Sequence, residues 1–227
     1  KSLLNYFSQL PYDLIHLHWL YPDGMAIPAL KKQGFNCVLT IHGSDWYNNI
    51  NRTDLFPIIK EIFKNVDHVL FVGHKLQEDV LSIFPFVKTK CSIIYNLVDQ
   101  EFYTHPSSHQ KEEALQKLGW DQNKKHFLTV ASSAPKKGVD LLIKAVLGLI
   151  EQYSDIKFHI VGTSQDDFPH SSSVSFHPFV TPKDLLTYYH ASNAYISPSR
   201  SEGFGLAMIE AATTGLPIAA TPTGIAP

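Results

Sequence analysis

The chain has 227 residues, of which 44% are hydrophobic and 12% aromatic, and its 19 basic and 21 acidic residues give a formal charge of −2. This composition excludes a disordered chain, and the balanced charge excludes a generic binder of nucleic acid, which would carry a basic excess. The two cysteines, Cys37 and Cys91, are too few for a disulfide scaffold, so we expect reduced thiols in a cytoplasmic protein. No stretch of about 20 residues is continuously apolar, which excludes a membrane-spanning helix.

Short β-branched or apolar runs alternate with longer amphipathic runs along the chain. The predicted strands are Leu14–His18, Cys37–His42, His68–Val72, Ser92–Tyr95, His126–Ala131, Lys157–Gly162, Val174–His177, Ala194–Ser197 and Pro217–Ala220. The predicted helices are Gly24–Gln33, Leu55–Asn65, Lys75–Phe84, Glu112–Leu118, Gly138–Tyr153, Pro182–His190 and Gly205–Thr214. This alternation predicts an α/β fold with mainly parallel sheets and helices on both faces.

A polar stretch without periodicity, residues 96–110, interrupts the alternation. Irregular chain of this length is typical of a connector between domains. We therefore predict an N-terminal domain over residues 1–100, a connector with its first helix over 101–119, and a C-terminal domain over 120–227. The chain starts at Lys1 rather than Met and closes on a loop-like Thr-Gly-Ile-Ala-Pro, so we expect both domains to be incomplete.

The segment between the strand at Ala194–Ser197 and the next helix combines residues that suit a diphosphate. A helix start offers unpaired N–H groups and a positive dipole end, which attract anions. Gly203 and Gly205 allow a ligand close to the backbone, while Glu202 and Glu210 supply acceptors on two sides. A nucleotide sugar, with ribose at one end and a sugar at the other, fits this pattern. The amides expected to face the phosphates are those of Phe204, Gly205 and Leu206.

The run Glu-Gly-Phe-Gly-x4-Glu-Ala, which begins at Glu202, resembles the donor-site signature of the GT-B retaining glycosyltransferases of family 4, also called group 1. The resemblance extends from about residue 12 to residue 227 and implies two Rossmann-like domains. It also implies that Glu202 contacts hydroxyls of the donor sugar and that Glu210 contacts the ribose.

Further segments resemble the family in register. Phe127–Leu142 is similar to its strand–loop–helix unit, which implies that Lys137 binds the donor phosphates. Ser132 stands where many members carry Arg, and Arg200 is a candidate to compensate for the missing charge. His-Ile-Val-Gly, which ends at Gly162, resembles the strand end near the nucleotide. A second match, in which Pro178 replaces the usual glycine, implies base contacts by Phe179 and Val180.

In the first half, Thr-Ile-His-Gly-Ser-Asp resembles the family's Thr-x-His-Gly-x-Asp. The resemblance implies that His42 touches the transferring sugar, whereas an ordinary histidine at a strand end is the alternative. Asp45 is either a partner for the ring or the acceptor, or a turn residue. His16 and His18 share one face of a strand, but no third ligand lies nearby in the sequence, so we expect no metal.

The resemblance implies a metal-independent hexosyltransferase that transfers a sugar from a nucleotide diphosphate-sugar to an acceptor hydroxyl with retention. The implied catalytic residues are His42, Lys137 and Glu202. The implied partners are the nucleotide-sugar donor and a carbohydrate or glycolipid acceptor, with no nucleic acid and no cofactor. The implied setting is polysaccharide, lipopolysaccharide or glycolipid biosynthesis in the cytoplasm, and peripheral association with the inner membrane face stays open.

Three alternatives also stay open. The first is a non-catalytic member that only binds sugar or a partner, and the second is a nucleotide-sugar epimerase or phosphorylase of the same fold. The third is an NAD-dependent oxidoreductase, because Gly203-x-Gly205 after a strand is part of a dinucleotide fingerprint. The third glycine of that fingerprint is replaced by Met208.

Overall fold

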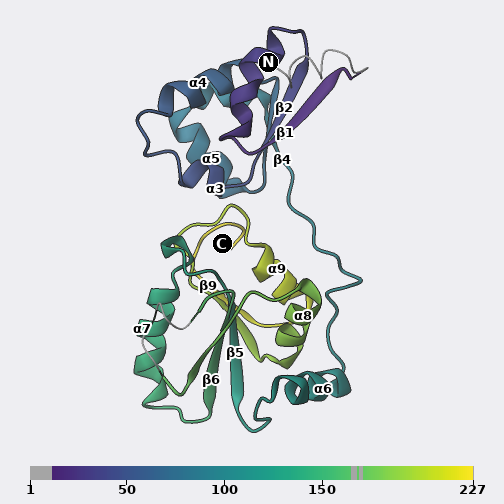
Figure 1. Ribbon diagram of the computed structural model, residues 1–227, viewed down its shortest axis with the longest axis vertical. Coiled ribbons are helices and arrows are strands. Elements are labelled where there is room, and N and C mark those ends of the chain that lie inside the picture. The colour runs from purple at the N-terminus through teal and green to yellow at the C-terminus, as the bar shows by residue number, and fades with distance from the viewer. Residues whose placement is uncertain (1–11, 165–167, 169–170, 227) are drawn as a thin grey trace. The chain divides into compact units, whose positions relative to one another are not determined.

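The structure is a computed structural model that describes residues 12–164, 168 and 171–226 (Figure 1). The chain divides into two compact units. The first unit runs to Asn96 and includes Glu202–Phe204, and the second takes Leu97–Ser201 and the residues from Gly205 onward.

The described residues of the first unit form a four-stranded parallel sheet in the order β1-β2-β3-β4. The strands are β1 (Leu14–His18), β2 (Asn36–Ile41), β3 (His68–Phe71) and β4 (Cys91–Ile93). The helices are η1 (Asp23–Ala26), α2 (Ile27–Lys31), α3 (Ser44–Tyr47), α4 (Phe56–Asn65), α5 (His74–Ile83) and η2 (Pro85–Lys90). Each strand pairs with the next one along the chain, so the strand order runs in one direction only.

The core of the first unit is apolar and comes from both strands and helices. The inner strand β2 buries Leu39 and Ile41 completely. In α4, the buried residues Ile59, Ile62 and Phe63 are three and four positions apart, which places them on one face of the helix. This spacing gives α4 one apolar face, which can be buried against the rest of the unit when the segment is helical.

The second unit contains a five-stranded parallel sheet in the order β7-β6-β5-β8-β9. Its strands are β5 (Lys125–Val130), β6 (Ile156–Val161), β7 (Val174–His177), β8 (Ala194–Ser197) and β9 (Ile218–Ala220). Its helices are α6 (Ser108–Leu118), η3 (Pro135–Lys137), α7 (Val139–Ile150), α8 (Pro182–Ala191) and α9 (Leu206–Thr213). The chain adds β6 and β7 on one side of β5, and then returns to add β8 and β9 on the other side.

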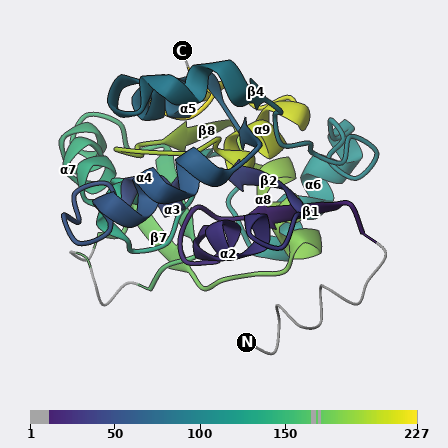
Figure 2. The ribbon, with the colours of Figure 1, turned by 90° about the horizontal axis from the view of Figure 1, so that it is seen from above.

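Helices cover both faces of the second sheet. One apolar cluster joins α7 to the sheet and includes Ile143 and Ile160. A second cluster joins α8 and α9 to the sheet and includes Leu128, Tyr189 and Met208. Figure 1 shows α7 on one side of this sheet and α8 on the other, and in Figure 2 α7 again lies apart from α6 and α8.

A column of closely packed rings, some buried and some half-buried, runs through the second unit. Nδ1 of His126 lies 2.9 Å from Nε2 of His159, and Nδ1 of His159 lies 3.2 Å from Nε2 of His177. The Trp120 indole stacks on the His159 ring with centroids 3.5 Å apart, and the Tyr188 hydroxyl lies 3.4 Å from Nδ1 of His177. We call His126, His159 and His177 the histidine column.

The predicted α/β architecture with two parallel sheets is confirmed, and each predicted strand ends within two residues of an observed one. The single helix predicted over Gly24–Gln33 is wrong in extent, because the chain forms the 3₁₀ turn η1 and then the shorter helix α2. Helix α6 begins earlier than predicted, because Ser107 and Gln110 form a reciprocal capping box at its start.

Candidate functional site

The second sheet has a switch point between β5 and β8, where the strand order reverses direction. In open α/β sheets, ligands bind beyond the carboxyl ends of the strands at such a point. Two segments leave the sheet here, which we call the β5 loop (residues 132–137) and the β8 loop (residues 198–204). Most of the predicted phosphate-binding residues lie on these two loops or directly after them.

Arg200 ties the β8 loop to the β5 loop. Its backbone N–H donates to the Lys136 carbonyl at 2.7 Å, and its guanidinium donates to the Pro135 carbonyl at 2.7 Å. The guanidinium also makes a bidentate ion pair with Asp140 in α7, with both N–O distances at 2.7 Å. The Arg200 guanidinium lowers the pKa of the Asp140 carboxyl to about 2. The charge that was predicted to assist phosphate binding is therefore paired across the two loops.

Gly138, which directly follows the β5 loop, lies close to Pro198 of the β8 loop. Its φ of +65° favours glycine, and a Cβ atom at this position would overlap the Pro198 carbonyl oxygen. Lys137 is the last residue of η3 and directly precedes Gly138, so it sits at the N-terminal end of α7. Ser132 follows β5 and is exposed. At the second loop, Gly205 has a φ of +97° and precedes the first turn of α9, where Leu206 is 44% exposed.

A pocket of about 110 Å³ lies at the carboxyl end of β5 and β6. It brings together four residues that the sequence analysis singled out separately, Gly162, Phe179, Val180 and Glu210. Other lining residues are Tyr103, Val130, Val161, Pro182 and Leu185. The volume is below the ~300 Å³ typical of a whole ligand site, so this pocket suits one part of a larger ligand. We call it the β6 pocket.

The lining of the β6 pocket is mostly apolar, with one carboxylate. Gly162 has a φ of +102°, and a Cβ atom here would come 3.0 Å from the Ala131 carbonyl oxygen. Phe179 is 89% exposed, which leaves its ring available at the rim. Such a combination of apolar wall, exposed ring and single acceptor suits a planar base with a polar sugar attached.

Glu210 has two tyrosine neighbours that the sequence analysis did not identify, Tyr189 and Tyr103. The Tyr189 hydroxyl donates to Oε2 of Glu210 at 2.8 Å, and Tyr103 lines the same pocket as Glu210. Burial, followed by the nearby Glu210 charge, raises the pKa of Tyr103 to about 12. Pro182 and Leu185 follow the predicted Phe179-Val180 pair within two helical turns, so they could have been found by extending that segment. Tyr103 carries no local signal.

The remaining predicted residues of the β8 loop, Glu202, Gly203 and Phe204, are grouped with the first unit. In that unit, Nε2 of His42 lies 3.0 Å from Nδ1 of His18. Burial lowers the pKa of His42, and the nearby Asp45 charge opposes this shift. At this distance one ring nitrogen donates a hydrogen bond to the other.

Asp45 has the geometry of a residue that ties loops together. Its two carboxylate oxygens accept from the backbone N–H groups of His42, at 3.0 Å, and Leu20, at 2.6 Å. Its side chain is buried, and burial raises its pKa while the backbone donors lower it. Of the two readings left open by the sequence, these bonds favour the turn residue.

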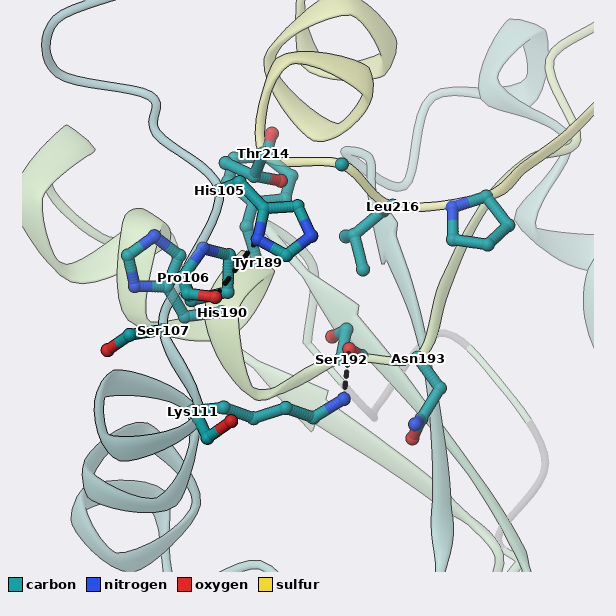
Figure 3. Close-up of a pocket in the computed structure, with 13 residues that line it drawn as sticks. His105, Pro106, Ser107, Lys111, Tyr189, His190, Ser192, Asn193, Thr214 and Leu216 are labelled. Carbon is teal, nitrogen blue, oxygen red and sulfur yellow. Dashed lines mark hydrogen bonds between the residues drawn. The ribbon is translucent and has the colours of Figure 1, made fainter.

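Figure 3 shows a second, larger pocket of the second unit, of about 300 Å³. Two of its polar side chains already have partners, since Lys111 donates to the Ser192 carbonyl at 3.4 Å and His190 bonds the Thr104 carbonyl at 3.1 Å. No residue predicted for the site lines this pocket. Tyr189 does line it, so this side chain lies between the second pocket and Glu210.

Within residues 12–164, 168 and 171–226, no three or more His, Cys, Asp or Glu side chains are arranged to hold a metal ion. His16, one of the two strand histidines, instead places Nε2 2.7 Å from the Thr40 hydroxyl. None of the helices in the described part of the chain is both long and apolar enough to cross a bilayer.

Two family models match the chain. The model described as "Glycosyl transferases group 1" matches residues 110–227, and the model "Glycosyltransferase Family 4" matches residues 1–102. Between them they cover both units, and the first model alone covers more than half of the sequence.

Similar proteins and structures support the same assignment. An uncharacterized glycosyltransferase of Methanocaldococcus jannaschii is 26% identical over 93% of this chain and 56% of its own length. The D-inositol 3-phosphate glycosyltransferase of Gordonia bronchialis is 28% identical over 94% of this chain and 52% of its own length. The structure of Anabaena HepE in complex with UDP and glucose matches with a TM-score of 0.80 at 20% identity, over 98% of this chain and 62% of that one. The chain thus spans about half the length of the curated relatives it matches.

Proposed function

Because the chain belongs to the glycosyl transferases group 1 family and has the GT-B fold, we propose that it transfers a sugar from a nucleoside diphosphate-sugar to an acceptor hydroxyl with retention at the anomeric carbon. Because the chain spans about half the length of the curated relatives it matches, we propose this activity for the whole protein to which the sequence belongs. The UDP and glucose in the HepE structure support a donor of this chemical class.

One observation carries the proposal. Glu210, Gly162, Phe179 and Val180 come from three separate parts of the chain, yet they line one pocket beside the switch point of the second sheet. The Phe179 ring can stack on a base, and the Glu210 carboxylate can accept from ribose hydroxyls. The diphosphate then extends from this pocket toward the β5 and β8 loops.

In the proposed reaction, the bond between the anomeric carbon and the β-phosphate oxygen breaks, and its electron pair leaves with the nucleoside diphosphate. The acceptor oxygen bonds to the same face of the sugar, and its proton passes to the departing phosphate. Negative charge grows on the β-phosphate, where a cation and helix N-terminal amides stabilise it. We assign this role to Lys137 and to the amides of Gly205 and Leu206, with Ser132 as a further hydrogen-bond donor.

The roles of the remaining residues follow from the family resemblance and stay predictions. Glu202 and His42 are assigned to the hydroxyls of the transferring sugar. The reaction is proposed to need no metal, and a hexose is the proposed group transferred. A polysaccharide, lipopolysaccharide or glycolipid is the proposed product, made in the cytoplasm or at the inner membrane face.

Thermal unfolding of the chain with UDP, GDP, ADP or NAD tests the donor site. A ligand present at ~100 times its dissociation constant stabilises a protein by ~2.7 kcal/mol, which raises the Tm of a chain of this size by roughly 5–10 °C. We expect one nucleoside diphosphate to give such a shift. Glu210→Ala and Lys137→Ala should reduce it, whereas Lys144→Ala, an exposed lysine of α7, should not.

A shift with NAD alone, or none with the three nucleoside diphosphates, would contradict the proposal. Catalysis is tested separately by following release of nucleoside diphosphate from the matching sugar donor with an added acceptor. The anomeric configuration of the product is read by proton NMR. Binding without transfer would favour the non-catalytic alternative, and an inverted product would contradict the retaining mechanism.

A further inference from the structure

A third pocket of the second unit, of about 400 Å³, lies between α6 and the segment that joins α6 to β5. Because residues 120–123 lead into β5, the pocket lies at the amino end of this strand. The six residues of β5 put the β5 loop, at the other end, about 20 Å away. Polar side chains and one indole line the pocket, and they belong to Glu112, Gln116, Trp120, Asp121, Gln122 and Asn123. We call it the Trp120 pocket.

The histidine column holds the Trp120 indole in place. The His126 and His159 rings stack on the indole with centroid distances of 4.7 and 3.5 Å. The two imidazole centroids are only 5.1 Å apart, so both rings lie on the same face of the indole. That face cannot line the pocket, and the half-buried indole therefore presents its remaining surface there. A ring fixed in this way loses little conformational entropy when a ligand packs on it.

The polar segment beside the indole is fixed as well. Oδ1 of Asp121 accepts from the backbone N–H of Asn123 at 3.0 Å and from its side-chain amide at 3.2 Å. The Asp121 carbonyl accepts from Nε2 of His126 at 2.9 Å. These bonds tie the turn to the same column that holds the indole. The aromatic surface and the polar groups of the pocket are therefore in place before any ligand arrives.

The lining of the Trp120 pocket favours one class of ligand. Glu112 and Asp121 contribute carboxylates, and among the described residues that line the pocket none is basic. A phosphate, a nucleotide or an acidic polymer would meet uncompensated negative charge here. A neutral sugar suits the lining, because its C–H groups pack on an aromatic ring while its hydroxyls bond to carboxylates and amides. The volume of about 400 Å³ is within the range of small-molecule sites.

We propose that the Trp120 pocket binds a neutral sugar unit of a saccharide chain, at a second site separate from the donor site. The distance of about 20 Å to the β5 loop excludes the pocket from the bond-breaking step. It holds a part of the saccharide remote from the reacting end. Binding of a saccharide here goes beyond the proposed function, whereas its identification as the acceptor or product of the transfer rests on that function.

The test labels the three tryptophans of the chain with fluorine and follows them by fluorine NMR, with Trp→Phe variants to assign the resonances. The probes are the neutral trisaccharides maltotriose, cellotriose and triacetylchitotriose, and the acidic trigalacturonate. We expect at least one neutral probe to shift the Trp120 resonance at about 10 mM, which nearly saturates a site with a Kd of about 1 mM. The acidic probe should bind at least about threefold more weakly. Trp46, which is 2% exposed, is the internal reference.

Two glutamines of the lining test which groups hold the sugar. Gln116 and Gln122 are both exposed, so their substitution leaves the fold intact, which the melting temperature verifies. Gln116→Ala and Gln122→Ala should each weaken binding of the neutral probe about threefold or more, as expected for one lost hydrogen bond. Gln152→Ala is the matched control, because Gln152 is equally exposed, follows α7 and does not line the pocket. This variant should bind the probe as tightly as the unmodified chain.

The outcomes separate this inference from the proposed function. If no neutral probe shifts the Trp120 resonance, or if trigalacturonate binds equally well, the inference is overturned. Unchanged affinity in both glutamine variants would overturn it too, since the lining would then not hold the sugar. The proposed function is judged by the nucleoside diphosphates alone. A chain that binds a nucleoside diphosphate but no neutral probe keeps the proposed function and loses this site, and the reverse result keeps the site and loses the proposed function.

Discussion

Gly138 links backbone geometry to the site, because its lack of a side chain lets the β5 loop approach Pro198. Gly138→Ala adds strain at a φ of +65° and an overlap with the Pro198 carbonyl oxygen. We expect this change to lower the free energy of unfolding by about 2–4 kcal/mol, measured by urea denaturation. Gly119→Ala is the control, because Gly119 has nearly the same φ, +66°, and open space around it.

Gly119→Ala should lower the free energy of unfolding by only about 1 kcal/mol, which is the strain of a residue with a side chain in the left-handed region. The difference between the two variants therefore measures the close approach alone. Equal effects would show that the contact with Pro198 contributes nothing to stability.

Arg200 has two possible relations to the phosphates, and its partner Asp140 distinguishes them. If Arg200 acts by tying the loops, Arg200→Ala and Asp140→Asn both loosen the site. Each should then weaken nucleoside diphosphate binding by a similar factor of about three, measured by calorimetry. If Arg200 instead binds the phosphates directly, Asp140→Asn frees its charge and strengthens binding. We expect the first result, since the guanidinium lies in a bidentate pair at 2.7 Å.

The histidine column makes β5, β6 and β7 sensitive to acid. Burial lowers the pKa of all three histidines, and that of His159 falls to about 2, helped by the neighbouring imidazoles. In the unfolded chain these side chains take up protons below pH ~6.5, whereas the folded chain keeps His159 neutral. Stability is therefore fully present above pH ~6.5 and is lost as the pH falls below it. Between pH 6.5 and 5, His159 alone accounts for a loss of about 2 kcal/mol in the free energy of unfolding.

Urea denaturation at pH 7 and pH 5 checks this prediction. The free energy of unfolding should differ less between pH 7 and pH 5 in His159→Gln than in the unmodified chain, by about 2 kcal/mol. This holds whatever the substitution does to stability at pH 7. His109→Gln is the control, since the His109 side chain in α6 is 78% exposed. Parallel pH profiles for the unmodified chain and His159→Gln would refute the role of the column.

At the scale of the whole molecule, hydrophobic periodicity was enough to predict the architecture. Strands such as β3 are recognisable as short apolar runs. In amphipathic helices such as α4, apolar residues recur every three to four positions, because one face of the helix covers a sheet. The periodicity did not predict the first residue of every helix. Helix α6 begins at Ser108, four residues before the prediction, since its polar first turn is held by the Ser107 capping box and not by apolar packing.

The candidate site divides in the same way. Gly162, Phe179, Val180 and Glu210 could be proposed from local motifs, and the fold brings them to one pocket. The hydrogen bond of Tyr189 to Glu210 and the position of Tyr103 in the same pocket could not be predicted, because a contact between residues so far apart depends on how helices pack on the sheet. The same holds for Arg200, whose partner Asp140 is 60 residues away.

The two sheets differ in a way that predicts where a nucleotide stabilises the chain. Among the described strands, only the second sheet reverses its strand order, at β5 and β8, while the first runs in one direction. Since ligands bind at such reversals, hydrogen exchange should slow most in the second unit when a nucleoside diphosphate is bound. The peptides expected to respond cover the β5 loop, the end of β6 and the first turn of α9.

When the free nucleotide concentration is about 100 times its dissociation constant, the exchange rate of amides that exchange only after ligand release should fall by about a hundredfold. Peptides from β1 to β4 should slow much less, because that sheet offers no switch point among its described strands. Glu210→Ala should remove the protection in α9 together with that at the end of β6, since both line the β6 pocket. Stronger protection in the first sheet than in the second would move the nucleotide site to the first unit and refute the assignment of the pocket.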